Sequence, residues 1–318
     1  MKAALVTGPG KTPVFADFQE PQPKDGELLI TVNAAAIHQV VKSRASGTHY
    51  SSSGKFPFVA GIDGVGRAGD GSRVYFVLPD APFGSMAERV AIDASRCLPV
   101  PDGLDDVTAA ALANPGLSSW AAYGERARLR PGETVLVNGA TGTSGRLAVQ
   151  IAKHFGAGRV IATGRNAEAL AEVAELGADV TIQLADDLED RIKPHFADGI
   201  DVVIDYLWGK SAETLLIAGA KAGPEAHPIR FVQIGSVSGA DITLPSAVLR
   251  SSAIELMGSG IGSVPMEKLI TCIGDLLQAA LPAGLKIALT PRSLYEIEQA
   301  WAEDDSRRRT VFLIGGPQ

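Results

Sequence analysis

The pattern of apolar and polar residues between positions 116 and 259 changes repeatedly from one period to another. Residues 134–138 (TVLVN) form a short β-branched run, typical of a strand that is buried on both faces. In residues 144–155 the apolar positions recur every three or four residues, which predicts an amphipathic helix. Another apolar run at residues 159–162 predicts the next strand. The pattern is that of a doubly wound parallel sheet, the Rossmann arrangement.

The same alternation continues along this region. Helices are expected at residues 167–176 and 211–219, and strands at residues 180–183, 201–205, 230–234 and 254–257. Since ligands bind outside the carboxyl ends of the strands of such a sheet, several loop residues should lie on one side of it. The loop residues expected there are Tyr206, Gly235, Ser236, Gly258, Ser259 and Gly260.

Residues 1–115 have a different character, with short strand-like runs separated by turns rich in Gly, Pro and Asp. Strands are expected at residues 3–7, 27–34, 73–78 and 87–92, which predicts a largely antiparallel β-rich domain, and a helix is expected at residues 107–113. The last segment, residues 260–318, should contain a helix at 265–280, a strand at 286–289, a short helix at 293–301 and a final strand at 310–314. Three segments are therefore predicted, with bounds 1–115, 116–259 and 260–318.

A glycine-rich turn connects the first strand and helix of the parallel sheet. Gly139, Gly142 and Gly145 recur every third residue, so the backbone can turn tightly and the helix can pack close to the strand. The first backbone N–H groups of the helix have no partners within the helix, and with the helix dipole they suit a pyrophosphate. The spacing differs from the usual G-x-G-x-x-G, so the strand–turn–helix context carries the prediction of a dinucleotide site.

The residues after the second strand decide between the two nicotinamide dinucleotides. A site for NAD usually carries Asp or Glu there to accept the ribose 2′-hydroxyl, whereas this chain has Thr163-Gly164-Arg165-Asn166. Because no carboxylate repels a 2′-phosphate and a guanidinium can pair with it, we expect NADPH as the cofactor. The alternative is that Arg165 is only a solvated residue at the start of a helix.

Composition narrows the class of protein. The chain has 318 residues, of which 46% are hydrophobic and 20% charged, and no apolar run is long enough to span a membrane. The net charge of −7 argues against nucleic-acid binding. Two cysteines cannot build a disulfide framework and fit a reducing compartment. The first ten residues read as a strand and lack the apolar core of a signal peptide, so we expect a cytoplasmic location.

Across nearly its whole length the chain resembles the medium-chain dehydrogenase/reductase superfamily, and within it the zinc-independent NADPH:quinone oxidoreductases. The resemblance rests on the segments KAALVTGPG, AAAIHQVVKSRASG, FPFVAGIDGVGR, GSMAERVAI, ETVLVNGATGTSGRLAVQIAKHFGA, ELGAD and DVVIDYLWG. It implies a chaperonin-10-like β-rich catalytic domain, a Rossmann domain and a C-terminal segment that returns to the catalytic domain. It also implies NADPH bound between the domains, and an oligomer for which we expect a homodimer.

The resemblance assigns roles to residues by position. It places the pyrophosphate on Ala140, Thr141, Gly142, Thr143 and Ser144. The 2′-phosphate would be read at Gly164 and Arg165, and the nicotinamide would lie near Gly235, Ser236 and the 258–260 segment. Ala169 stands where the family has a lysine that binds the adenosine phosphate, so Arg165 would have to bind that phosphate without this lysine.

Other departures concern the catalytic side. In zinc-dependent relatives, metal ligands fall near His38, Asp63 and Pro115, and no cysteine stands at these positions here. Because three ligands must converge on a catalytic zinc, we expect none. The amide that many quinone oxidoreductases place beside the nicotinamide is replaced by His38.

Without zinc, reduction of a quinone or an α,β-unsaturated carbonyl is the favoured reaction, because donors or a proton can take up the charge that develops on oxygen. We expect His38, Lys42 and Tyr50 to line the substrate side, with one of them as the donor. Each also has a purely structural interpretation: a backbone-bonded histidine, a solvated lysine and a loop aromatic. Alternative functions are an enoyl-thioester reductase and an NADPH-binding protein without catalytic activity.

Overall fold

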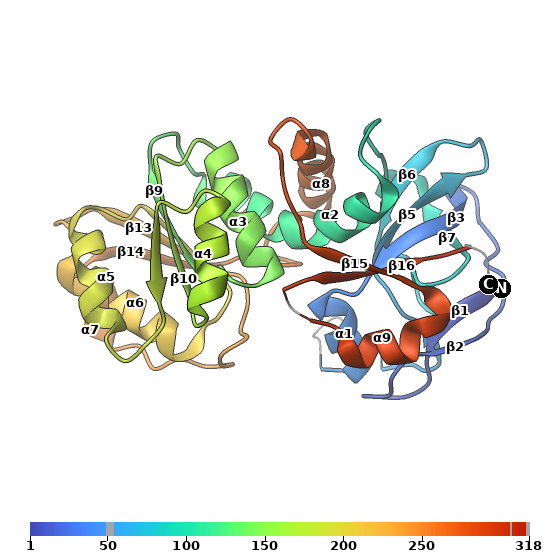
Figure 1. Cartoon of the computed structure of the whole chain (residues 1–318), viewed down its shortest axis with the longest axis horizontal. Helices are drawn as coiled ribbons and strands as arrows, with labels where there is room; N and C mark the ends of the chain where they lie inside the picture. The colour runs from blue at the N-terminus through green and yellow to red at the C-terminus, as the bar shows by residue number, and fades with distance from the viewer. Residues whose placement is uncertain (49–53, 306, 316–318) are drawn as a thin grey trace. The chain divides into compact units, whose positions relative to one another are not determined.

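The computed structural model describes residues 1–48, 54–305 and 307–315. The chain forms two compact units (Figure 1). The first contains Met1–Pro115 together with Ile273–Gln318, and the second contains Gly116–Cys272. Residues 260–272, expected in the C-terminal segment, belong instead to the second unit, and the C-terminal part of the first unit begins at Ile273.

The first unit is built on two sheets. The smaller has the order β2-β1-β4, and its pairs are antiparallel: β1 (Lys2–Val6), β2 (Val14–Asp17) and β4 (Phe58–Val59). The larger has the order β15-β16-β3-β5-β6-β8, with β7 also paired to β3: β3 (Glu27–Ala36), β5 (Asp63–Ala68), β6 (Arg73–Val77), β7 (Arg89–Asp93), β8 (Cys97–Pro99), β15 (Leu289–Ser293) and β16 (Arg309–Leu313). The C-terminal strand β16 thus lies beside β3, and the β-rich class expected for this unit is confirmed.

Helices α1 (Gln39–Ser46) and α9 (Ile297–Glu303) lie beside one another in the first unit (Figure 1), and a lysine of α1 contacts the end of α9. Short 3-10 turns occur at η1 (Ala94–Arg96) and η3 (Leu294–Glu296). Two longer helices, α2 (Asp106–Ala121) and α8 (Met266–Ala280), contain the boundaries between the units. Alternate residues of β3 such as Ile30 and Val32 are buried in the core of this unit.

The second unit holds a parallel sheet of order β11-β10-β9-β12-β13-β14, the doubly wound order that the sequence predicts. Its strands are β9 (Thr134–Asn138), β10 (Arg159–Gly164), β11 (Val180–Gln183), β12 (Val202–Asp205), β13 (Pro228–Gln233) and β14 (Ala253–Gly258). Helices α3 (Thr143–His154) and α4 (Ala167–Glu175) cover one face, and α5 (Leu188–Ala197) and α6 (Gly209–Ala222) cover the other (Figure 1). The π-helix η2 (Ala122–Ala127) and α7 (Ser246–Arg250) complete the unit.

One predicted strand has the wrong bounds, and four strands of the first unit were missed: β2, β4, β5 and β8. Residues 286–288 are not in a strand, and β15 begins at Leu289 and continues through Pro291. The proline obscures the strand pattern, but β15 is an edge strand, where proline is tolerated. β5 was not predicted because Gly64 and Gly66 weaken its strand pattern. A Cβ on Gly66 would lie 2.3 Å from the Thr31 carbonyl oxygen, so the close approach of β3 and β5 requires glycine.

The two cysteines and the lengths of the helices bear on the class of protein. Neither cysteine forms a disulfide: Cys272 is buried on α8, and Cys97 is partly buried at the start of β8. Burial, with a smaller contribution from the charge of Asp93, raises the pKa of the Cys97 thiol to about 11. Among the described helices, none is long and apolar enough to cross a membrane.

Candidate functional site

The residues predicted to bind a dinucleotide lie together in the second unit, at the carboxyl ends of its parallel strands. Ala140 and Thr141 follow β9, Gly142 caps α3, and Thr143 and Ser144 begin that helix. Gly164 ends β10 and Arg165 follows it, Tyr206 follows β12, and Gly235 and Ser236 lie just beyond β13. Gly258 ends β14, and Ser259 and Gly260 follow it. Backbone hydrogen bonds link these ends, since Tyr206 N donates to Asn138 O at 3.1 Å and Gly235 N donates to Asp205 O at 3.1 Å.

The three glycines of the turn have different surroundings. Gly139 has a φ of +89°, a conformation that favours glycine. A Cβ on Gly145 would lie 2.3 Å from the Gly139 carbonyl oxygen, so α3 packs on the turn only because no side chain intervenes. A Cβ on Gly142 would meet nothing within 4 Å, so this N-cap position faces open space at the start of α3. A close-packed turn with an open helix N-terminus fits a bound pyrophosphate.

Arg165 is exposed, and its guanidinium makes no ion pair or hydrogen bond to the described part of the chain. The backbone oxygen of Arg165 accepts a hydrogen bond of 2.9 Å from Gln183 Nε2, which ties the loop after β10 to the end of β11. Asn166 caps α4 by accepting a hydrogen bond of 2.9 Å from Ala169 N. The guanidinium is therefore positioned by a fixed backbone and is available for an anionic ligand.

A buried polar network beneath the turn was not predicted. Thr163 Oγ1 donates to Asn138 Oδ1 at 2.7 Å, and Asn138 Nδ2 donates to Asp205 Oδ1 at 2.8 Å. The backbone N–H groups of Leu207 and Trp208 also donate to the Asp205 carboxylate. Burial raises the pKa of Asp205, and the hydrogen bonds that it accepts oppose that rise. The network joins the carboxyl ends of β9, β10 and β12, where the turn begins.

Tyr206 does not present its hydroxyl to the open edge of the sheet. It is buried, and its hydroxyl lies 3.0 Å from Ser118 Oγ within the second unit. Burial raises the pKa of Tyr206 to about 12, so it stays protonated at neutral pH. At this position the backbone of Tyr206, and not its hydroxyl, lies at the strand ends.

In the first unit, His38 directly precedes α1 and is buried, with 2% of its surface exposed. Its Nε2 lies 3.1 Å from Oδ1 of Asp63, at the start of β5, although the two atoms are not aligned for a hydrogen bond. The other oxygen, Oδ2, accepts a hydrogen bond of 2.5 Å from the hydroxyl of Tyr75 on β6. His38 Nδ1 has no partner among the described residues.

Lys42, one helical turn after His38, is held by the C-terminal part of the first unit. Its ammonium lies 2.9 Å from Asp304 Oδ2 and donates to the Trp301 carbonyl oxygen at 3.3 Å. This engagement makes Lys42 a structural link between α1 and the end of α9. Tyr50, the third predicted donor, lies outside the described residues.

A pocket of the first unit lies beside α1, which contributes Val41 and Arg44 to its lining. It is lined mainly by apolar and aromatic side chains, among them Val41, Phe56, Phe58, Ile62 and Phe83. Arg44 is the charged residue of this lining, and burial lowers the pKa of its guanidinium. Aromatic walls of this kind suit a flat ring.

Comparison with known proteins places the chain in a family. It is 30% identical over 359 residues to a probable NADPH-dependent quinone reductase, tdiC, of Emericella nidulans, and the match covers 99% of this chain and 100% of the relative. The chain belongs to the quinone oxidoreductases of the medium-chain dehydrogenase/reductase superfamily. It is also 32% identical to the quinone oxidoreductase of Pongo abelii over 88% of this chain and 84% of the relative. This quinone oxidoreductase family member is an NADP-dependent oxidoreductase that binds a nicotinamide cofactor and acts on a small molecule.

A solved structure supports the family fold. The quinone oxidoreductase of Thermus thermophilus, whose structures include a complex with NADPH, matches with a TM-score of 0.83 and 29% identity over 99% of this chain and all of that chain. Residues 145–275 match the family described as zinc-binding dehydrogenase.

In the part of the chain that the structure describes, the side chains near His38 do not supply the three ligands of a catalytic zinc. Within residues 1–48, 54–305 and 307–315, no three side chains of His, Cys, Asp or Glu gather where a metal ion could be held. His38 and Asp63 supply two candidate ligands, and one oxygen of Asp63 already binds Tyr75. A catalytic zinc takes three protein ligands.

Proposed function

We propose that this quinone oxidoreductase family member uses NADPH to reduce a quinone, or a related α,β-unsaturated carbonyl, by hydride transfer without zinc. The observation that carries the choice of NADPH is the unpaired guanidinium of Arg165 at the end of β10, where no carboxylate opposes a 2′-phosphate. Bound NADPH would supply the hydride. The names of tdiC and of the Thermus thermophilus enzyme support quinone as the acceptor.

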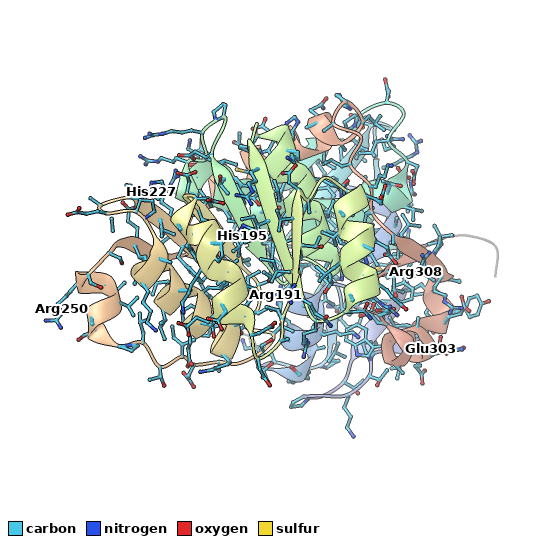
Figure 2. All side chains as sticks on the ribbon, turned by 60° about the vertical axis from the view of Figure 1, so that its left-hand side comes forward. Arg191, His195, His227, Arg250, Glu303 and Arg308 are labelled. Atoms are coloured by element: carbon cyan, nitrogen blue, oxygen red, sulfur yellow. The ribbon has the colours of Figure 1, made fainter. Side chains whose placement is uncertain are left out.

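The experiment that tests the cofactor choice compares Arg165→Ala with wild type in fluorescence titrations with NADPH and NADH. Since hydrogen bonds to charged groups contribute about 1.5–3 kcal/mol, NADPH should bind about 10- to 100-fold more weakly to the variant, with little change for NADH. Arg250→Ala is the matched control, because Arg250 is another exposed arginine of the second unit and lies on α7 (Figure 2). Equal weakening for NADPH and NADH would contradict the assignment.

His38 is the best supported proton donor of the three that the sequence suggests. Lys42 is engaged by Asp304, whereas His38 Nδ1 is left without a partner by the described residues. The reduced substrate oxygen needs a donor of this kind, because its negative charge develops away from water.

An NADPH oxidation assay separates the candidate functions. We expect turnover with 1,4-benzoquinone, 9,10-phenanthrenequinone or a small enone, and metal analysis should find less than stoichiometric zinc in the active protein. Turnover with an enoyl thioester alone would favour an enoyl-thioester reductase. Tight NADPH binding without any turnover would favour a binding protein.

We also propose a homodimer formed through the outer edge of β14. This strand lies at the edge of the parallel sheet. Leu256 on the strand is 38% exposed, and Ile261, which follows the strand, is 39% exposed. An uncovered strand edge with apolar side chains is prone to pair with a second copy. Light scattering after size exclusion should give twice the chain mass, and Leu256→Lys should lower it.

A further inference from the structure

We infer that the aromatic pocket beside α1 is a binding site for a small aromatic acid, a planar ring that carries a carboxylate or a sulfonate. The ring would lie against the phenylalanine side chains of the lining, and the anionic group would pair with Arg44. The inference goes beyond the proposed function, because it concerns a site within the first unit and depends neither on NADPH nor on the reduction of a quinone.

The aromatic walls of the pocket provide the surface for the ring. Phe56, Phe58 and Phe83 line the pocket, and each is partly buried and packed against the core of the first unit. The ring centroids of Phe56 and Phe58 lie 5.5 Å apart, with an angle of 42° between the ring planes. Because the core holds these rings while part of their surface stays exposed, they offer ordered aromatic surface to a flat ligand.

The depth of the pocket limits the size of the ligand. Buried aliphatic side chains close the inner end of the pocket, among them Val41, Val59 and Ile62. The cavity itself measures about 30 Å³, and the empty space is about 510 Å³ when the part that opens to solvent is included. We therefore expect a ligand with a single ring that is only partly enclosed.

Arg44 brings a positive charge to this apolar lining without a matching negative charge. Among the described residues that line the pocket there is no Asp or Glu, and the sequence has neither between Glu27 and Asp63. Arg44 is half-buried, and burial lowers the pKa of its guanidinium. Removing a charged group from water is costly unless an opposite charge compensates it, so this guanidinium favours an anionic partner.

The other buried and half-buried arginines of the first unit differ from Arg44 because each has a partner. Four of them contact a carboxylate, and the fifth donates to the carbonyl oxygen of Ile37: Arg73, Arg89, Arg96, Arg292 and Arg309. The guanidinium of Arg44 forms no hydrogen bond or ion pair with any residue in the described ranges. The unit thus compensates its other enclosed arginines internally and leaves this one for a ligand.

The two features together define the class of ligand. A carboxylate or sulfonate can accept two hydrogen bonds from a guanidinium, and an attached ring can cover the phenylalanine side chains. A neutral ring would leave the charge of Arg44 unpaired, whereas a small anion without a ring would leave the aromatic walls uncovered.

The experiment measures binding of 4-fluorobenzoate and 4-fluorobenzamide to the full-length protein by fluorine NMR titration. The benzoate should bind about 10-fold more tightly than the benzamide or better, because the neutral amide cannot form a charge-assisted pair with Arg44. Acetate, which has the charge but lacks the ring, should displace the benzoate only at much higher concentration than unlabelled benzoate does.

Three variants assign the two contributions. Arg44→Met should bind the benzoate and the benzamide equally, since methionine keeps a long apolar side chain and removes the charge. Phe58→Leu should weaken both ligands by a similar factor, about two- to tenfold, because it removes aromatic contact and leaves the charge. Arg67→Met is the matched control: Arg67 is an exposed arginine of the same unit, outside the lining, that donates to Gly71 O at 3.0 Å. It should leave both affinities at the wild-type values.

The outcomes separate this site from the proposed function. Equal affinity of the wild-type protein for the two fluorinated ligands would overturn the inference, as would an undiminished preference for the benzoate in folded Arg44→Met. If Arg44→Met does not fold, Arg44→Gln carries the same test. The titrations contain neither NADPH nor a quinone, so their failure leaves the proposed function standing, and a lack of turnover in the NADPH oxidation assay leaves this site standing.

Discussion

The side-chain amide of Asn138 donates a hydrogen bond of 2.8 Å to the carboxylate of Asp205, which joins the ends of two neighbouring parallel strands 67 residues apart in the chain. Asp205 accepts from the backbone of Leu207 and Trp208 at the same time. The carboxylate thus fixes the path of the chain after β12, next to the glycine turn. Several buried donors depend on this one side chain.

Replacing Asp205 with alanine should therefore destabilise the second unit strongly. The backbone donors of Leu207 and Trp208 would lose this acceptor, and each unsatisfied buried group costs about 1–3 kcal/mol. The Asn138 amide would keep only its hydrogen bond to Ser211 Oγ. We expect the free energy of unfolding to fall by at least about 2 kcal/mol in urea titrations. Asp186→Ala, at an exposed loop carboxylate, should change it by less than about 0.5 kcal/mol; equal effects of the two substitutions would refute the role of the network.

Two glycines of the same turn should respond to alanine with different effects on stability. Gly145→Ala would bring a Cβ within 2.3 Å of the Gly139 carbonyl oxygen, so we expect a loss of about 1–3 kcal/mol in stability together with weaker NADPH binding. Gly142→Ala meets open space, and its φ of −80° suits alanine. That variant should keep the wild-type melting temperature and lose NADPH affinity by fluorescence titration, because the methyl group enters the space assigned to the pyrophosphate. Unchanged affinity in a folded Gly142→Ala variant would contradict that assignment.

Asp179 should make stability depend on pH on the acid side. Burial acts to raise its pKa, but hydrogen bonds of 2.6 Å from the Lys153 ammonium and from Val160 N outweigh burial, and the pKa is lowered. Because the folded pKa lies below the unfolded value of about 3.9, the stabilisation is present above that pH and is lost as pH falls through the folded pKa. In Asp179→Asn the loss of stability between pH 7 and pH 3, measured by urea midpoints, should be smaller than in wild type. Parallel pH curves for the two proteins would be inconsistent with this role.

The parallel sheet was predictable because its signal is local. Residues 134–138 and 180–183 have strand bounds that agree with the structure, since each is a short buried run flanked by turn residues. The strand at residues 63–68 was missed because its two glycines serve contacts with another strand, which no local pattern reveals. Tertiary packing here overrides strand propensity.

In the candidate site, too, some residues could be predicted from the sequence and others depend on tertiary contacts. Arg165 could be proposed from the sequence because it follows a predicted strand, and His38 could be proposed through the resemblance to the family. The contact between His38 and Asp63 could not be predicted from local patterns. The hydrogen bond between Asp63 and Tyr75 depends on the register of β5 against β6, in which Asp63 pairs with Val77 and Tyr75 pairs with Val65. The link between Asn138 and Asp205 likewise depends on β9 and β12 being neighbours in the sheet.

The protonation and burial of the two cysteines bear on how the protein would withstand the quinones proposed as its substrates. Quinones are electrophiles that arylate thiolates, and a thiol reacts in proportion to the fraction that is ionised. With a pKa of about 11, Cys97 is almost entirely protonated at neutral pH, and Cys272 is only 5% exposed. A protein that reduces quinones, as proposed above, would thereby be shielded from inactivation by them.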